Sequence, residues 1–171
     1  DIYTSSSNVS VEINGGSIKG SADNTFGIRG KENIVVNINA GVISAVPGNR
    51  LAMYISGDKD NAIKINMKGG TIEADSQAIQ AYSGAVINVS DSASITSKTG
   101  TAISTQSGYG VVELNVTGGN ITTGGSTAYA IYARGSSKVN VEGGTISGGT
   151  AVYAYDTANV QISGGDITGK S

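Results

Sequence analysis

The residues of this chain that could perform acid–base chemistry are its carboxylates, because histidine and cysteine are both absent. Without histidine there is no imidazole base for a Ser-His-Asp triad and no histidine ligand for zinc. Carboxylates would have to gather on one face to bind calcium or to act as a paired acid and base on a glycan. They are scattered instead: Asp58 and Asp60 share a stretch with Lys59, and Glu73 and Asp75 follow one isoleucine. We therefore predict no catalytic residue, no metal site and no cofactor.

The composition is that of one folded domain covering residues 1–171. The chain is 38% hydrophobic and 14% charged, with a formal charge of −2 and 26 glycines. A disordered chain would combine low hydrophobicity with high net charge. No stripe of Lys and Arg is available for nucleic acid, and no apolar run approaches the ~20 residues of a transmembrane helix. The chain opens at Asp1 without a signal-peptide pattern, so we expect a mature fragment of a larger protein.

A repeated unit, Gly-Gly-x-Ile, organises the chain and indicates a solenoid. We call its isoleucines the anchors, and they end the units Gly15-Gly16-Ser17-Ile18, Gly69-Gly70-Thr71-Ile72, Gly118-Gly119-Asn120-Ile121, Gly143-Gly144-Thr145-Ile146 and Gly164-Gly165-Asp166-Ile167. Two degenerate units, Ala40-Gly41-Val42-Ile43 and Ser92-Ala93-Ser94-Ile95, fill the gaps. Successive anchors are then 25, 29, 23, 26, 25 and 21 residues apart. A variable period near 25 residues fits stacked coils whose loops differ in length.

Three short strands are expected in each coil, because apolar and polar residues alternate with the two-residue period of a strand. The first is a triplet ending five residues before the anchor: Val11-Glu12-Ile13, Val36-Asn37-Ile38, Ile65-Asn66-Met67, Leu114-Asn115-Val116, Val139-Asn140-Val141 and Val160-Gln161-Ile162, with Ile87-Asn88-Val89 shifted by one residue. The second strand is the anchor with its Ser and Thr neighbours. The third follows a variable loop: Ile28-Arg29-Gly30, Met53-Tyr54-Ile55, Ile79-Gln80-Ala81, Ile103-Ser104-Thr105, Ile131-Tyr132-Ala133 and Val152-Tyr153-Ala154.

These strands predict an all-β fold, a right-handed parallel β-helix of six to seven coils with three strands per coil. No coil can bury its apolar residues alone, so the coils must stack about 4.8 Å apart. The Gly-Gly step supplies the unusual backbone angles of the tight corner between the first and second strands. A β-sandwich is the alternative, but it leaves seven in-phase anchors without an explanation. Exposed terminal coils would be open strand edges, so self-association between coils or rods is also expected.

The outward columns of the third strand carry most of the tyrosines. The first column reads Arg29, Tyr54, Gln80, Ser104, Tyr132 and Tyr153, and the second reads Lys31, Ser56, Tyr82, Gln106, Arg134 and Tyr155. Tyr129 lies just before this strand. Tyrosine offers a rigid apolar ring with a polar tip, and arginine adds a planar fork, which together suit glycan or protein contact. The candidate ligand-binding residues are therefore Tyr54, Tyr82, Tyr132, Arg134, Tyr153 and Tyr155, with shielding of the sheet as the alternative role.

Two other outward columns have structural explanations. An amide column on the first strand can form hydrogen bonds from coil to coil; its members are Asn37, Asn66, Asn88, Asn115 and Asn140. A hydroxyl array flanks the anchors and is similar to those of ice-binding solenoids; its members are Thr71, Ser94, Thr96, Thr122, Thr145, Ser147 and Thr168. Lys19, Glu73 and Asp166 interrupt that array, so ice binding is not expected.

The run Val139-Asn140-Val141-Glu142-Gly143-Gly144-Thr145-Ile146, followed by Thr150-Ala151-Val152-Tyr153-Ala154, resembles the passenger region of bacterial autotransporters, the pertactin-like β-helices. The resemblance covers residues 8–171. It implies export by type V secretion, display on the bacterial cell surface and roles in adhesion, aggregation or virulence. The chain has no translocator barrel, no Arg-Gly-Asp tripeptide and no Gly-Asp-Ser-Gly protease signature.

We therefore expect an extracellular adhesin, an autoaggregation segment or a structural stalk that is not an enzyme. Its expected partners are host or matrix glycans or proteins, or other copies of itself. The alternative is a polysaccharide lyase or glycosidase, because many enzymes that degrade acidic glycans share this fold and a fold does not specify a function.

Overall fold

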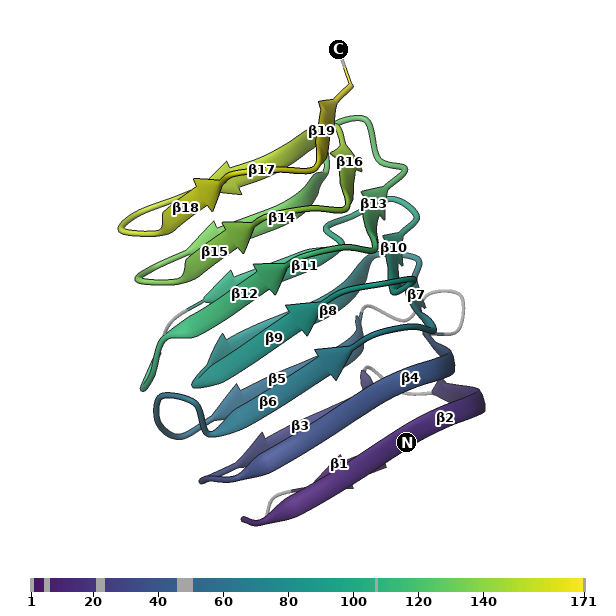
Figure 1. Ribbon diagram of the computed structural model, residues 1–171, viewed down its shortest axis with the longest axis vertical. Coiled ribbons are helices and arrows are strands. Elements are labelled where there is room, and N and C mark those ends of the chain that lie inside the picture. The colour runs from purple at the N-terminus through teal and green to yellow at the C-terminus, as the bar shows by residue number, and fades with distance from the viewer. Residues whose placement is uncertain (1, 5–6, 21–23, 46–50, 107, 171) are drawn as a thin grey trace.

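The computed structural model describes residues 2–4, 7–20, 24–45, 51–106 and 108–170, and every regular element among them is a β-strand. Neighbouring strands are parallel, and coils of about 25 residues stack into a solenoid of about six turns. Figure 1 shows the coils rising from the purple N-terminal end to the yellow C-terminal end. The predicted parallel β-helix with three strands per coil is confirmed. In the described part of the chain no helix is available to cross a membrane.

The first sheet takes one strand from each coil, and we call its outer surface the tyrosine face. Its seven strands are β1 (Ile2–Thr4), β3 (Asn24–Gly30), β5 (Leu51–Gly57), β8 (Gln77–Ser83), β11 (Ile103–Gln106), β14 (Tyr129–Arg134) and β17 (Thr150–Ala154). They lie behind the other strands in Figure 1, in this order from bottom to top.

The remaining strands form two further faces that are joined by β2 (Val9–Gly20) and β4 (Ile34–Ala45), which are long enough to turn the corner between them. The asparagine face continues with β6 (Ile63–Met67), β9 (Ala85–Val89), β12 (Val112–Val116), β15 (Lys138–Val141) and β18 (Asn159–Ile162). The threonine face continues with β7 (Thr71–Ala74), β10 (Ser94–Ser97), β13 (Asn120–Thr123), β16 (Thr145–Gly148) and β19 (Asp166–Gly169).

The strand register confirms the seven predicted anchors. Ile18 pairs with Ile43, and the same column continues through Ile72, Ile95, Ile121, Ile146 and Ile167. The first-strand triplets are also in phase, including Ile87-Asn88-Val89, which pairs residue for residue with its neighbours on both sides. Parallel stacking thus places like side chains above one another.

The interior is a continuous apolar column that only stacking can bury. The anchors Ile43, Ile72 and Ile95 are at most 1% exposed, and so are Phe26 and Met53 behind the tyrosine face. Removing an isoleucine side chain down to Cβ from such a site costs about 2–5 kcal/mol. In the last coil the corresponding side chains lie at an open edge, where Ile162 is 48% and Ile167 36% exposed.

Glycine is required at the corner between the asparagine and threonine faces. Gly144 has φ +84°, and a Cβ there would lie 2.8 Å from the carbonyl oxygens of Gly118 and Gly119 in the coil below. The coil that has Ala93 at this corner contains one more residue, and Asp91 takes the positive φ (52°) instead. The extra residue explains why the triplet of that coil starts one position early in the sequence.

Candidate functional site

The tyrosine face gathers three tyrosine rings on its two C-terminal strands. Tyr129 and Tyr132 come from β14 and Tyr153 from β17, and Tyr129 pairs with Thr150 while Tyr132 pairs with Tyr153. The Tyr129 and Tyr153 rings are stacked with centroids 4.9 Å apart and an interplanar angle of 25°. Tyr132 lies 5.1 Å from Tyr129 and 5.4 Å from Tyr153, tilted against both. We call these three rings the tyrosine cluster.

Arg134 extends this cluster. Its guanidinium carbon lies 5.6 Å from the centre of the Tyr132 ring, and its Nη1 donates a 3.5 Å hydrogen bond to Gln106 Oε1 of the coil below. Tyr155 follows β17 and continues the parallel pairing next to Arg134, because its backbone N–H bonds to Ala133 O at 2.9 Å. Tyr153 and Tyr155 are 39% and 52% exposed, on and just after β17, the last strand of this sheet.

A second cation–π pair lies on the same face nearer the N-terminal end. The Arg29 guanidinium lies 5.1 Å from the centre of the Tyr54 ring. The predicted column is wrong here: Gly27, not Arg29, pairs with Tyr54, and Arg29 pairs with Ser56. Lys31 is displaced likewise, beyond the end of β3. The reason is interior packing, since the large Phe26 occupies the position of Met53 and shifts the strand by two residues from the predicted register.

Tyr82 is also displaced from its predicted column. A bulge between β5 and β8 pairs Ser56 with Ser83 and leaves Tyr82 as the extra residue. Its ring turns toward the next loop, because a Cβ on Gly108 would lie 3.0 Å from the ring. Tyr82 makes no ring contact with another described tyrosine. Of the six predicted binding residues, the structure therefore brings Tyr132, Arg134, Tyr153 and Tyr155 together and places Tyr54 and Tyr82 apart.

The predicted binding residues leave out Tyr129, although its ring contacts both other rings of the cluster. The sequence signal was present, because Thr127-Ala128-Tyr129 precedes an apolar residue at the start of the third strand. The alternation predicts that the third strand begins at Ile131, with Tyr129 in the preceding loop, whereas in the structure β14 begins at Tyr129.

The predicted asparagine ladder is confirmed as a chain of hydrogen bonds. Each amide donates from Nδ2 to the side chain below it: Asn66 to Asn37 at 2.8 Å, Asn88 to Asn66 at 2.8 Å, Asn115 to Asn88 at 3.0 Å and Asn140 to Asn115 at 2.9 Å. Asn37 ends the ladder by donating to Glu12. These amides are engaged with one another, so this face has fewer free polar groups for a ligand.

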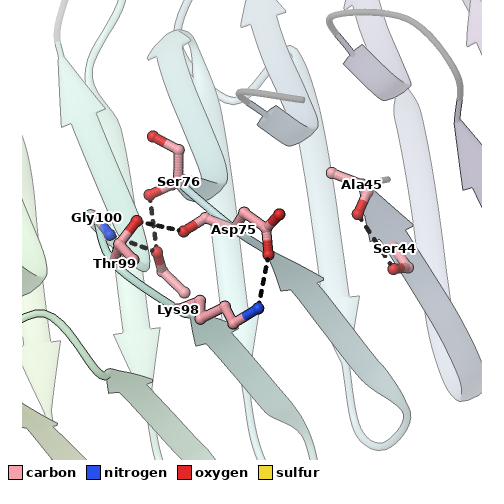
Figure 2. Close-up of polar contacts among 8 residues, drawn as sticks. Ser44, Ala45, Asp75, Ser76, Lys98, Thr99 and Gly100 are labelled. Carbon is pink, nitrogen blue, oxygen red and sulfur yellow. Dashed lines mark hydrogen bonds and ion pairs between the residues drawn. The ribbon is translucent and has the colours of Figure 1, made fainter. Parts of the chain in front are cut away.

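Of the carboxylates that the sequence singles out, Asp60 and Asp75 are held in structural contacts. Asp60 Oδ1 accepts a 2.6 Å hydrogen bond from the backbone N–H of Val111, joining loops two coils apart. Asp75 forms a 3.6 Å ion pair with Lys98 (Figure 2). Lys59 holds the pKa of Glu32 below its usual range by hydrogen bonding and charge attraction. Across the described ranges, no group of three Asp, Glu, His or Cys residues is placed to hold a metal ion.

A groove of about 380 Å³ lies at the corner between the threonine and tyrosine faces. Ala45 and Ala74 contribute apolar wall, and Glu73, Asp75 and Lys98 contribute charge. Hydrogen bonds between coils hold this wall in place. Thr99 Oγ1 donates to Asp75 O at 2.8 Å (Figure 2). Ser97 Oγ donates to Ser76 O at 2.7 Å. These contacts join successive coils, so the groove is formed by the stacking of neighbouring coils at this corner.

Comparisons of this chain with protein-family models, with curated proteins and with solved structures found no match. The support for the candidate site therefore comes from the geometry of its residues.

Proposed function

We propose that this chain is a surface-displayed solenoid that binds glycan through the tyrosine cluster. The observation that carries the proposal is the contact among Tyr129, Tyr132 and Tyr153, whose ring centroids lie 4.9 to 5.4 Å apart on an open sheet face. The apolar C–H face of a sugar ring packs on an aromatic ring, and the phenol and guanidinium groups can bond to hydroxyls. A flat platform of this kind binds a polymer without enclosing it.

The solenoid itself provides the stalk in this proposal. Its coils are tied by parallel strands and by the asparagine ladder, so the cluster is presented on a rigid rod. Display outside a bacterial cell, as the resemblance to autotransporter passengers implies, is part of the proposal. A polysaccharide-degrading enzyme has less support, because the described carboxylates are dispersed and Asp60 and Asp75 have structural partners.

The test is a glycan and matrix-protein array with the wild type and with a Tyr132→Ala/Arg134→Ala/Tyr153→Ala/Tyr155→Ala variant. We expect the wild type to bind one or more glycans and the variant to lose about tenfold or more in affinity, as loss of an aromatic hot spot does. The control is Thr96→Ala/Thr122→Ala, which alters outward side chains of the threonine face.

Equal binding by the wild type and the fourfold variant would show that the cluster is not the site. Absence of binding by the wild type would leave a passive stalk. Release of unsaturated uronides from polygalacturonate would favour the enzyme instead.

A further inference from the structure

The tyrosine face differs from the rest of the molecule in its charge. The chain has 13 acidic residues and a formal charge of −2, yet none of the strands β3, β5, β8, β11, β14 and β17 contains Asp or Glu. The same strands carry two arginines, Arg29 and Arg134. These strands therefore carry positive charge on a chain that is negative overall, and Asp156 lies beyond them, in the turn that follows Tyr155.

Both arginines keep their charge uncompensated within the described residues. The three ion pairs found there all use lysines, and all lie off this sheet: Lys59–Glu32, Lys98–Asp75 and Lys138–Glu113. The described contacts of Arg29 and Arg134 are instead to the rings of Tyr54 and Tyr132 and to the amide of Gln106. A guanidinium has five N–H donors in a fork that fits a carboxylate or a sulfate.

The two Arg–Tyr pairs are arranged along the rod. Tyr54 and Tyr132 belong to one column, with Gln80 and Ser104 between them. Three strand steps of about 4.8 Å separate the rings by about 14 Å. Uncharged side chains fill the space between, so a linear ligand lying along the rod can contact both pairs.

We propose that the ligand of the tyrosine face is a linear acidic polysaccharide, with sugar rings on the tyrosines and carboxylates or sulfates on Arg29 and Arg134. This inference rests on the proposed glycan-binding function and specifies its ligand class. A single-stranded nucleic acid could also stack on tyrosine, but it carries a phosphate at every nucleotide, and two arginines on an acidic chain match that density poorly.

The test compares two polymers that share a backbone, polygalacturonate and its fully methyl-esterified form, in which the carboxylates are neutral. We expect the wild-type chain to bind polygalacturonate about tenfold more tightly, with an affinity that falls as salt rises. Arg134→Gln should lose about tenfold for polygalacturonate, the scale of one charge-assisted hydrogen bond, and little for the ester. Arg29→Gln should lose less affinity for polygalacturonate, because Arg29 lies beside the single ring of Tyr54 and not beside the tyrosine cluster.

The matched control is Lys64→Gln, which removes one exposed positive charge from β6 on the asparagine face. It should leave binding of both polymers unchanged. Circular dichroism and thermal unfolding of each variant verify that the solenoid is intact.

Several results would overturn the inference. Equal loss in Lys64→Gln and Arg134→Gln would mean that net charge alone matters. Tighter binding of an oligothymidylate than of polygalacturonate would assign the face to nucleic acid. Equal binding of both galacturonans, lost in Tyr132→Ala, would refute the acidic ligand and leave the glycan-binding function standing. Binding of neither polymer, nor of any glycan on the array, would remove both proposals together.

Discussion

The asparagine face and the tyrosine face both carry ladders of outward side chains on parallel strands, but their polar groups have different partners. On the asparagine face, Asn88 donates to Asn66 and accepts from Asn115, so the amides bond to one another. On the tyrosine face, ring contacts hold the cluster together while the charge of Arg134 has no carboxylate partner among the described residues. Stacking alone therefore does not make a surface inert. The type of side chain in the column determines the outcome. Amides form hydrogen bonds to the next coil, whereas tyrosine and arginine keep polar groups that can bind a ligand.

The largest difference between the two faces is expected when an amide is changed to an acid on each face of one coil. Asn88→Asp removes the hydrogen that Asn66 Oδ1 accepts and places two oxygens against each other, so we expect a loss of about 1–3 kcal/mol in unfolding free energy. Gln80→Glu has no side-chain hydrogen bond to lose among the described residues and should change stability by less than about 0.5 kcal/mol. Chemical denaturation measures both.

The same two variants should also differ in ligand binding. Gln80→Glu puts a carboxylate between the two Arg–Tyr pairs and should weaken polygalacturonate binding severalfold, whereas folded Asn88→Asp should bind as the wild type does. Equal loss of stability in the two variants would mean that the ladder contributes nothing particular to the asparagine face.

A smaller effect on glycan affinity is expected from Tyr129→Leu. This variant tests whether Tyr129, which is not among the predicted binding residues, belongs to the site. Its stacked contact with Tyr153 is worth about 0.5–1.5 kcal/mol. We expect glycan affinity to fall about fivefold, measured by titration calorimetry. The control is Tyr109→Leu, because Tyr109 is 86% exposed but lies in a loop off the tyrosine face. A greater loss in the Tyr109 variant would move the site to that loop.

The smallest effect is expected at the exposed ion pair of Lys59 and Glu32. The pair lowers the pKa of Glu32, so any stabilisation is present at neutral pH and is lost as pH falls through that lowered pKa. Solvent screens the pair, so Glu32→Gln should unfold at the wild-type temperature at pH 7. If Glu32→Gln lowered Tm clearly at neutral pH but not in acid, the Lys59–Glu32 pair would stabilise the fold more than an exposed ion pair is expected to.

The repeat and its first two strands were predictable because their spacing is local. Seven residues separate Val11 from Ile18, and the same distance recurs in every coil except that of Ile95, where Asp91 takes up the extra residue. The asparagine ladder could be predicted from the same spacing, because the asparagines are the middle residues of the triplets that it aligns. The tyrosine face was predicted less well, because a loop of variable length precedes each third strand.

The amino-acid sequence specifies the parallel solenoid, its anchors and its amide ladder, because the repeated apolar residues of one coil can be buried only by stacking another coil on it. Which residues of the third strand share a column depends on the packing between coils. Phe26 and Ile28 are both apolar at alternate positions, so the pattern fits either register. In the structure Phe26 pairs with Met53 and Ile28 with Ile55, so both are buried against apolar partners. That choice places Arg29 beside Ser56, within reach of the Tyr54 ring. In the same way, the cluster forms because β14 begins at Tyr129. Pairing with β17 extends the strand two residues before Ile131, where the alternating triplet begins.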